Sequence, residues 1–485
     1  MSPVNESDRS KKRRSTDCAI QVVGTSCSSF WTDFLQAVVQ RGKPLVHAGG
    51  SDHWPQKTCG HLLRTHNRLA RPVTSITVHS ASWVVPVQSP VIENGALACD
   101  DTHIIEVGRA AEIQKKYPRA AVSRHEQAAL TPPLVNAHIH LELSHLNSLS
   151  LASSPLHFTD WIYSLIALRN QLGATGPYVE DAAKKCVIEQ YQTGVGLIAD
   201  IGNTRINQSL AAVFNGRLLA FKEYLGFSGR GLNKILSRLH AEPHDQLCSA
   251  HAVYSTHKLL LQALKKRADT LAALFPVHVA EPYAEIELMN ENQGELVEFL
   301  TERGFWDPNF ADDPDRTRQG SVAYLHKIGC LNERTLCVHG VHVSDEEIVL
   351  LSETGAKVCV CPGSNRFLHV GKAPVEKYIA AGIQPGLGTD SFASNPVLSI
   401  WREMQILHQE HPEVDCADIF AMATLWGARS LGMEDKIGAL APGSNADLLA
   451  VPVPGGINTE KEVLSYLVSG GRAIIPAWIH GRGEA

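Results

Sequence analysis

The strongest constraint on the fold is the alternation of apolar, strand-like runs with helical segments between residues 134 and 411. The runs are short and rich in Val, Ile and Leu, whereas the segments between them show the periodicity of amphipathic helices. Strands are expected at Leu134–His140, Val195–Gly202, Arg217–Leu225, Leu247–Tyr254, Pro276–Glu281, Thr335–Gly340, Lys357–Pro362 and Pro385–Asp390. Helices are expected at Asp160–Leu172, Tyr178–Thr193, Ser255–Ala273, Glu285–Arg303, Ser344–Thr354 and Asn395–His411. Eight strands alternating with helices predict an α/β protein with a (β/α)8 TIM barrel.

Short strand-like runs with turn residues between them lie on both sides of this region. They are found at Val73–Ala98, His103–Val107, Ile437–Leu440, Ala446–Val451 and Tyr466–Arg472. Because short strands separated by turns are typical of antiparallel sheets, we expect the two flanks to form one small β-sandwich. The predicted domains are therefore a composite β-sandwich of residues 73–131 plus 436–480 and a barrel of residues 132–435.

The first 72 residues differ in composition from the rest of the chain. They hold eleven Lys and Arg against five Asp and Glu, whereas the whole chain has a net charge of −6. Regular periodicity is weak, which predicts a basic, disordered N-terminal extension. The alternatives are a targeting or nucleic-acid patch at Lys11–Arg14, a metal site of Cys59, His61 and His66, and a start of translation near Val73.

The composition excludes several classes of function. The hydrophobic content of 44% is that of a globular protein, and the small net charge indicates neither nucleic acid nor a membrane as a partner. No apolar stretch approaches the roughly 18 residues of a membrane span. The eleven cysteines form no Cys-x-x-Cys motif, so we expect free thiols in a reducing cytoplasm.

Metal-binding and acid–base side chains follow several of the predicted strands. In barrel enzymes the chemistry lies at the carboxyl ends of the strands. Those ends carry His138, His140, His251, His278, Glu281, His339 and Asp390. His138 and His140 are two residues apart, so both imidazoles point to the same side of a strand. Each residue also has a structural alternative, such as a core position for His278 or a helix cap for Asp390. Their occurrence together at strand ends favours one shared site.

The residue types in this set indicate metal-assisted hydrolysis. Three imidazoles and one carboxylate with an open position are typical of a catalytic zinc site, with Fe2+ as the alternative metal. Such a metal lowers the pKa of its bound water towards neutrality and makes hydroxide available. Attack on an unsaturated ring carbon also requires protons at the ring nitrogen and at the leaving amine. Glu281, three residues after His278, is placed to carry a proton, and His339 to orient the hydroxide.

Five motifs carry a resemblance to a known family. They are His-Ile-His at 138–140, Val-His-Val-Ala-Glu-Pro at 277–282, Val-His-Gly-Val-His at 338–342, Cys-Pro-Gly-Ser-Asn at 361–365 and Gly-Thr-Asp-Ser at 388–391. Together they resemble the amidohydrolase superfamily, and within it the cytosine/adenosine deaminase and chlorohydrolase branch. Residues 438–448 are similar to that family's return into its β-sandwich, and the resemblance covers residues 73–475.

The resemblance implies a role for each matching residue. It makes His138, His140, His278 and Asp390 the ligands of a single metal ion, since no lysine that could bridge two metals follows the fourth strand. It makes Glu281 the proton shuttle, places His339 beside the nucleophilic water and lets Asp390 take a proton from that water. Two departures from the family pattern touch the backbone near the site: Pro133 stands where the family has Gly, and Val253 where it has Pro.

The substrate side is less specific. Substrate contacts are expected from His251, Trp161, Phe392 and Asn395, where Trp161 has packing as its alternative. Residues 306–320 form a polar segment that is expected to act as a lid over the site, and His342 is expected to lie behind the site or at the surface.

The sequence therefore predicts a metal-dependent hydrolase for a small molecule. The first interpretation is hydrolytic deamination of an amino-substituted heterocycle or nucleoside, such as aminofutalosine or an adenosine-like compound. Loss of chloride from a triazine-like ring and hydrolysis of a cyclic amide are the alternatives on the same residues, and a non-catalytic scaffold is a third. The sequence does not indicate an oligomeric state, and the resemblance adds only that members of the family often form homodimers.

Overall fold

The computed structural model describes residues 75–152 and 157–480. The predictions for residues 1–72, including the basic patch and the Cys59–His61–His66 site, lie outside the described residues.

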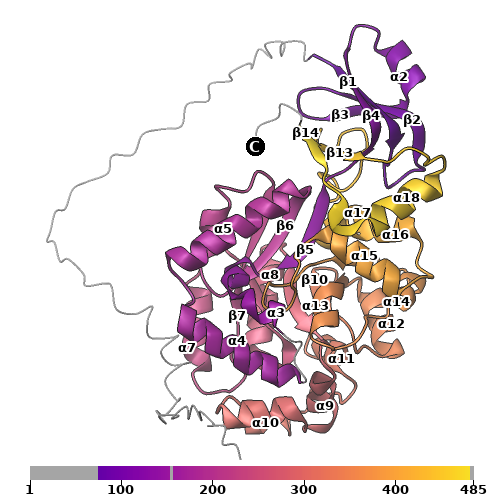
Figure 1. The fold of residues 1–485 in the computed structure, drawn as a ribbon. Helices are drawn as coiled ribbons and strands as arrows, with labels where there is room; N and C mark the ends of the chain where they lie inside the picture. The colour runs from indigo at the N-terminus through magenta and orange to yellow at the C-terminus, as the bar shows by residue number, and fades with distance from the viewer. Residues whose placement is uncertain (1–74, 153–156, 481–485) are drawn as a thin grey trace, which may run out of the picture. The chain divides into compact units, whose positions relative to one another are not determined.

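The eight strands predicted between residues 134 and 390 are all present, in two parallel four-stranded sheets within the described chain (Figure 1). The first sheet has the order β5-β6-β7-β8 and the second has the order β12-β11-β10-β9. The strands are β5 (Leu134–Ile139), β6 (Val195–Gly202), β7 (Arg217–Tyr224), β8 (Leu247–Ala250), β9 (Phe275–Val279), β10 (Thr335–His339), β11 (Lys357–Val360) and β12 (Gly386–Leu387). Parallel neighbours place all their carboxyl ends at the same edge of a sheet.

The two parallel sheets share a core and meet at two points. Val135 of β5, Phe221 of β7 and Leu336 of β10 belong to one buried apolar cluster that draws on both sheets. An isolated parallel bridge joins Ile139 to Asp390, and a second joins Ala252 to His278. Both bridges lie at the carboxyl ends of the strands, so the two sheets approach each other where the predicted site residues are found.

Helices connect these strands, as the alternation predicts. Their bounds are α3 (Ser148–Leu151), α4 (Phe158–Leu172), α5 (Pro177–Gln192), α6 (Ile206–Leu210), α7 (Leu232–His240), α8 (Lys258–Thr270), α9 (Tyr283–Glu291), α10 (Glu295–Glu302), α11 (Ser321–Lys327), α12 (Asp345–Thr354), α13 (Pro362–Phe367), α14 (Val375–Ala380), α15 (Ile400–Glu410), α16 (Cys416–Met422) and α17 (Leu425–Ser430). None of the helices in residues 75–152 and 157–480 has both the length and the apolarity needed to span a membrane.

One predicted helix is interrupted. The expected helix Glu285–Arg303 is two helices, α9 and α10, because the chain between them is left-handed: Asn292 has a φ of 63° and Gly294 a φ of 93°. Asn and Gly are the residues that tolerate this conformation best, so Asn292 and Gly294 account for the break. Hydrophobic periodicity alone does not reveal it.

The flanking strands pair across the two ends of the described chain. The sheet has six strands in the order β14-β13-β4-β1-β2-β3, and a second sheet that would complete a sandwich is not found in the described part (Figure 1). Its strands are β1 (Thr77–Val84), β2 (Ile92–Cys99), β3 (Ile104–Arg109), β4 (Ala121–Thr131), β13 (Leu448–Pro452) and β14 (Ala477–Ile479), and α2 (Ala110–Lys116) connects β3 to β4. β13 pairs antiparallel with β4, which joins the C-terminal flank to the N-terminal one.

Two predicted C-terminal strands are wrong. Ile437–Leu440 is a turn region, and most of Tyr466–Arg472 lies in α18 (Glu460–Ser469) and the 3-10 turn after it. The helix begins with a capping box, in which Thr459 Oγ1 accepts from the N–H of Glu462 while the Glu462 carboxylate accepts from the N–H of Thr459. Val463, Leu464, Leu467 and Val468 are all buried. Adjacent buried pairs that recur every four residues follow the helical period, because a strand would alternate buried and exposed positions.

Replacement of Gly196 by alanine is expected to destabilise the fold. A Cβ at this position in β6 would lie 2.8 Å from Pro133 Cβ and 3.0 Å from Ile437 Cδ1. We expect Gly196→Ala to lower the free energy of unfolding by about 1–3 kcal/mol through overpacking, measured by urea denaturation. Gly455→Ala is the control, because a Cβ there meets nothing within 4 Å, and it is expected to change stability by less than about 0.5 kcal/mol. Equal effects of the two substitutions would contradict this account.

Candidate active site

An irregularity in β5 turns the two histidines of the first motif towards the other strands. The register of β5 with β6 shifts between Asn136 and Ile139, so that β5 contains one extra residue there. Such a bulge reverses which residues face each side of the sheet. Val135 and Ala137 face the buried cluster, and His138 and His140, one residue out of that alternation, both lie beside His278.

Three imidazole nitrogens converge at this point. His278 Nε2 lies 3.2 Å from His138 Nε2 and 3.4 Å from His140 Nε2. The Asp390 carboxylate completes the group, because its Oδ1 lies 3.6 Å from the Nε2 atoms of both His138 and His140. All four side chains are buried.

Hydrogen bonds on the far sides of two rings explain why the nitrogens face one another. His140 Nδ1 lies 2.9 Å from the carbonyl oxygen of Ile201, and His278 Nδ1 lies 2.6 Å from that of His251. A carbonyl can only accept, so each Nδ1 carries the proton and each Nε2 presents a lone pair. Lone pairs that face each other at these distances repel unless a cation lies between them. The donor set therefore fits a divalent metal with nitrogen and oxygen ligands.

Serine hydroxyls and backbone groups hold Asp390 in place. The residue has a φ of 57°, and its N–H donates to the carbonyl oxygen of His138. Ser364 Oγ and Ser394 Oγ both donate to Oδ2, which leaves Oδ1 directed at the imidazoles. Burial opposes ionisation, but the close contact with His138 and the other neighbouring imidazoles outweighs it, and the pKa of Asp390 is held well below its usual range.

Glu281 lies on a tight turn after β9, and a second carboxylate holds that turn. Ala280 has a φ of 52°, and Glu285 accepts hydrogen bonds from the N–H groups of Ala280 and Glu281 at 2.9 and 3.1 Å. Burial, reinforced by the charge of Asp390, raises the pKa of Glu281 well above its usual range. A carboxyl that remains protonated near neutral pH is suited to donate a proton. Glu285 was not singled out in the sequence, although it stands four residues after Glu281.

His339 faces Glu281 from the next strand. Its Nε2 lies 3.6 Å from Glu281 Oε1, and its Nδ1 lies 2.9 Å from Asn365 Oδ1. Asn365 therefore orients the ring, a role that sequence reasoning did not assign although the residue ends the Cys-Pro-Gly-Ser-Asn motif. Burial lowers the pKa of His339, which favours the neutral imidazole.

His251 lies beside the convergent nitrogens but is not one of them. Its ring centroid is 5.1 Å from that of His278, and its Nδ1 lies 2.6 Å from Ser255 Oγ. It is more exposed than the buried histidines around it. This position allows a contact with a bound molecule, which was the role expected of it.

The other three predicted substrate contacts are tied to the protein. Trp161 Nε1 donates to the carbonyl oxygen of Ala393 at 2.9 Å, and the carbonyl oxygen of Phe392 accepts from Ser150 Oγ. Both rings pack against the apolar core. The side-chain amide of Asn395 donates to the Thr389 carbonyl oxygen and to Glu403, and its oxygen accepts from the N–H of Val397. Its hydrogen-bonding capacity is thus taken up by neighbouring protein groups.

His342 and the predicted lid lie outside the convergent group. His342 Nε2 is 2.6 Å from the carbonyl oxygen of Val370. The segment 306–320 contains a 3-10 turn at Pro308–Phe310 and is tethered to α8, since Lys258 Nζ donates to Asp313 at 2.6 Å. A hollow of about 390 Å³ lies against this segment and includes Phe227, His257 and Tyr324 in its lining.

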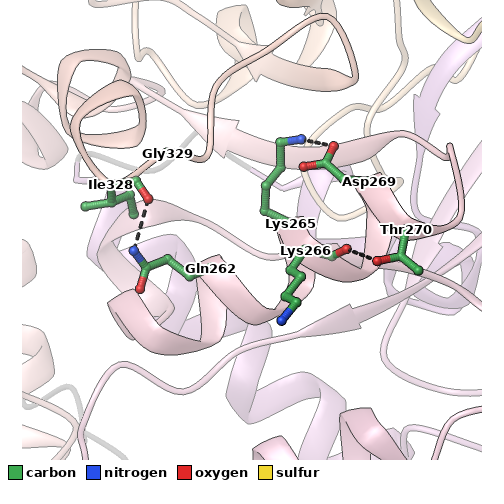
Figure 2. A pocket seen from close by; sticks show the side chains of 7 residues that line it. All are labelled: Gln262, Lys265, Lys266, Asp269, Thr270, Ile328 and Gly329. Carbon is green, nitrogen blue, oxygen red and sulfur yellow. Dashed lines mark hydrogen bonds and ion pairs between the residues drawn. The ribbon is translucent and has the colours of Figure 1, made fainter.

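A second hollow, of about 520 Å³, lies along α8 and contains none of the predicted site residues (Figure 2). Gln262 Nε2 donates to the Ile328 carbonyl oxygen, and Lys265 pairs with Asp269 four residues later. Thr270 Oγ1 likewise donates to a backbone carbonyl oxygen, that of Lys266. Most of the polar side chains that line the hollow are thus bonded within the protein, and none belongs to the candidate site.

Comparison with known proteins decides the family. Residues 129–473 match the amidohydrolase family. The chain belongs to this family. It is 30% identical over 380 residues to a 5-methylthioadenosine/S-adenosylhomocysteine deaminase of Nitratidesulfovibrio vulgaris, covering 74% of the chain and 79% of that relative. It is 27% identical to an aminodeoxyfutalosine deaminase of Nitratiruptor, covering 78% of the chain and 92% of that relative.

Solved structures show the same fold. An adenosine deaminase from Xanthomonas campestris with bound zinc aligns with a TM-score of 0.65 and 25% identity, covering 82% of this chain and 90% of that one. The aminofutalosine deaminase of Helicobacter pylori aligns with a TM-score of 0.69 and 21% identity over 84% of this chain and all of that one. The chain is thus an amidohydrolase-type enzyme, as the motifs at its strand ends indicated.

Metal analysis tests the convergent histidines. We expect the purified protein to contain about one divalent metal ion per chain and His138→Ala to retain less than about a tenth of it, because the variant loses one of the converging nitrogens. Mass-spectrometric metal analysis after gel filtration measures this. His342→Ala is the matched control, since its ring bonds to the Val370 carbonyl oxygen, and it should keep the wild-type metal content. Full metal content in His138→Ala would rule out this ligand set.

Proposed function

We propose that this protein is a metal-dependent deaminase that hydrolyses the exocyclic amino group of an adenosine-like nucleoside or a related heterocycle. The Nε2 lone pairs of His140 and His278 and the Asp390 carboxylate converge on one point, and Glu281 and His339 lie next to that point. This geometry is the observation that carries the proposal. One side of this arrangement suits a metal and the other suits proton transfer to a ring nitrogen.

The metal in this proposal is a single zinc ion held by His138, His140, His278 and Asp390. When bound, it would lower the pKa of a water molecule towards neutrality and so supply a nucleophile at pH 7. No lysine follows β8, where His251 stands instead, which supports one metal rather than two.

The protein's own residues account for the proton transfers. In the proposed sequence, water adds to the ring carbon that bears the amino group, Asp390 takes one proton from it, and Glu281 protonates the adjacent ring nitrogen. Glu281 then takes the proton of the new hydroxyl group while Asp390 passes its proton to the amine. The carbon–nitrogen bond breaks, a carbonyl forms and ammonia leaves. His339, oriented by Asn365, lies next to Glu281 and keeps the attacking oxygen in position.

We infer further that β5–β12 close into one eight-stranded barrel. The bridges Ile139–Asp390 and Ala252–His278 join the free edges of the two sheets, and the solved relatives share the fold. The barrel domain of residues 132–435, its composite β partner, a homodimer and a cytoplasmic location stay predictions.

The substrate class is proposed from the relatives. Their names include deaminases of 5-methylthioadenosine, S-adenosylhomocysteine and aminodeoxyfutalosine, all of which are adenine-containing compounds. The test is ammonia release from the zinc-loaded protein with these compounds, adenosine, adenine, cytosine and a chlorinated triazine. We expect ammonia from at least one adenine nucleoside, with kcat/KM at least about 10⁴ M⁻¹s⁻¹ for the preferred compound. Chloride from the triazine without ammonia from any compound would overturn the deaminase assignment.

Replacement of Glu281 tests the proton transfers of the proposed mechanism. We expect Glu281→Gln to lower kcat for ammonia release by about 10²–10⁴-fold, because the amide keeps the shape of the side chain but cannot exchange a proton. The metal content should remain that of the wild type, which separates this effect from loss of a ligand. Glu295→Gln, on α10, is the control carboxylate and should retain wild-type kcat. A Glu281→Gln variant with wild-type kcat would remove Glu281 from the mechanism.

A further inference from the structure

Glu223 is a buried carboxylate in the candidate active site, and the proposed mechanism gives it no role. It stands at the carboxyl end of β7, two residues after Phe221, so both side chains lie on the same side of the strand. Phe221 belongs to the apolar cluster shared by the two sheets. Ligand atoms of Glu223, His251 and His278 all lie within 4.8 Å of one another. Glu223 therefore faces the same space as the candidate metal ligands.

One oxygen of Glu223 is fixed by a relay of hydrogen bonds from α4. Arg169 Nη1 donates to Asn203 Oδ1 at 3.2 Å, and Asn203 Nδ2 donates to Glu223 Oε2 at 2.6 Å. A guanidinium can only donate, so it determines which end of the Asn203 amide faces Glu223. Arg169 is itself held by Glu142 Oε1 at 2.8 Å. Because Arg169 can only donate, both hydrogen bonds of this relay are donated towards Glu223.

The other oxygen of Glu223 is buried and accepts no hydrogen bond from the described residues. The side chain is only 8% exposed, and a buried carboxylate oxygen without a donor costs free energy. The neighbouring His251 is more exposed, so a molecule that contacts His251 comes within reach of this oxygen. The Oε1 atom is therefore a buried acceptor to which none of the residues that the structure describes donates.

A second metal ion does not explain this arrangement. It would need His278 as a shared ligand, but His278 Nδ1 is bonded to a backbone carbonyl. Its Nε2 has a single lone pair, which points to the first group of nitrogens. Of the residues that the structure describes, only Glu223 and His251 would remain for a second ion, which is fewer than the three or four protein ligands of a zinc site.

We propose that Glu223 Oε1 is a specificity-determining acceptor, which selects substrates that present an N–H or O–H donor beside His251. The inference rests on the proposed function, because it concerns the substrate of the same site. Two sources of the donor share this chemistry: the N–H of a free heterocycle and a sugar hydroxyl of a nucleoside. A site built to pair with a donor strongly rejects the analogue that lacks it, since the buried acceptor is then left unpaired.

The experiment compares substrate pairs that differ by one donor. The first pair is adenine and 9-methyladenine, and the second set is adenosine with 2′-deoxyadenosine and 3′-deoxyadenosine. The zinc-loaded wild type is expected to prefer the donor-bearing member of one set by at least about tenfold in kcat/KM. In Glu223→Gln this preference should fall below about threefold or reverse. The relay from Arg169 holds the new amide oxygen towards Asn203 and so turns its N–H2 group to the substrate.

Controls separate recognition from a structural role. Glu242→Gln removes another carboxylate that bonds to β7 residues, Lys222 and Tyr224, and should leave the preference unchanged. Metal content and thermal unfolding are measured for every variant. Should Glu223→Gln fail to fold, Glu223→Asp decides, because it withdraws the acceptor by one methylene and should reduce the same preference. An equal loss of kcat/KM on both members of each pair would overturn the inference, as would a wild type with no preference in either set.

Calorimetric binding of the same compounds to the zinc-loaded protein distinguishes this inference from the proposed function. Binding without ammonia release would overturn the deaminase assignment alone, and loss of the donor preference in Glu223→Gln binding would still support the role of Glu223. Absence of binding by all of these compounds would overturn both.

Discussion

Two hydrogen bonds to backbone carbonyls set the chemistry of this protein. His140 and His278 each give the Nδ1 proton to a strand-end carbonyl, of Ile201 and His251 respectively, and so present Nε2 lone pairs to a common point. The acceptors belong to the main chain at the ends of neighbouring strands, so the direction of the lone pairs depends on the alignment of those strands. The parallel sheets thus position the site residues and also fix the tautomers of two of the histidines.

Around this centre the carboxylates serve three purposes. Asp390 accepts hydrogen bonds from two serines and is charged before the reaction, whereas Glu281 has few partners and is held towards its neutral form by burial. Glu285 and Glu403 are buried too, but they accept backbone N–H groups and act on the turns that carry other residues. Burial raises the pKa of Glu403 to about 8 although the bonded N–H of Gly363 opposes this. The same side-chain chemistry therefore serves charge, proton transfer and support, according to what surrounds it.

The sequence predicted the parts of the molecule that have a period or a motif. The eight strands followed from short apolar runs, and the histidines followed from their positions at strand ends. Tyr466–Arg472 was misassigned because short apolar runs fit both helix and strand, and the capping box at Thr459 that decides between them was not weighed. Asn395 looked like a substrate contact, but its amide is occupied by Thr389 and Glu403. Asn365 stood in the Cys-Pro-Gly-Ser-Asn motif, but its role appears only from its contact with His339. Glu223 gave no signal, because its role depends on contacts with Asn203 and with the histidines of other strands.

The contact between β5 and the segment that follows β12 has a consequence for how the protein folds during its synthesis. Asn136 Nδ2 donates to Thr389 Oγ1, a partner 253 positions later in the chain. A ribosome must therefore complete most of the polypeptide before the first histidine pair meets the aspartate that joins it. Closing so long a loop is entropically unfavourable and slow, so the early segments remain without their partner during synthesis. The centre of the enzyme is consequently assembled late, and a chain that stops short of Asp390 lacks it altogether.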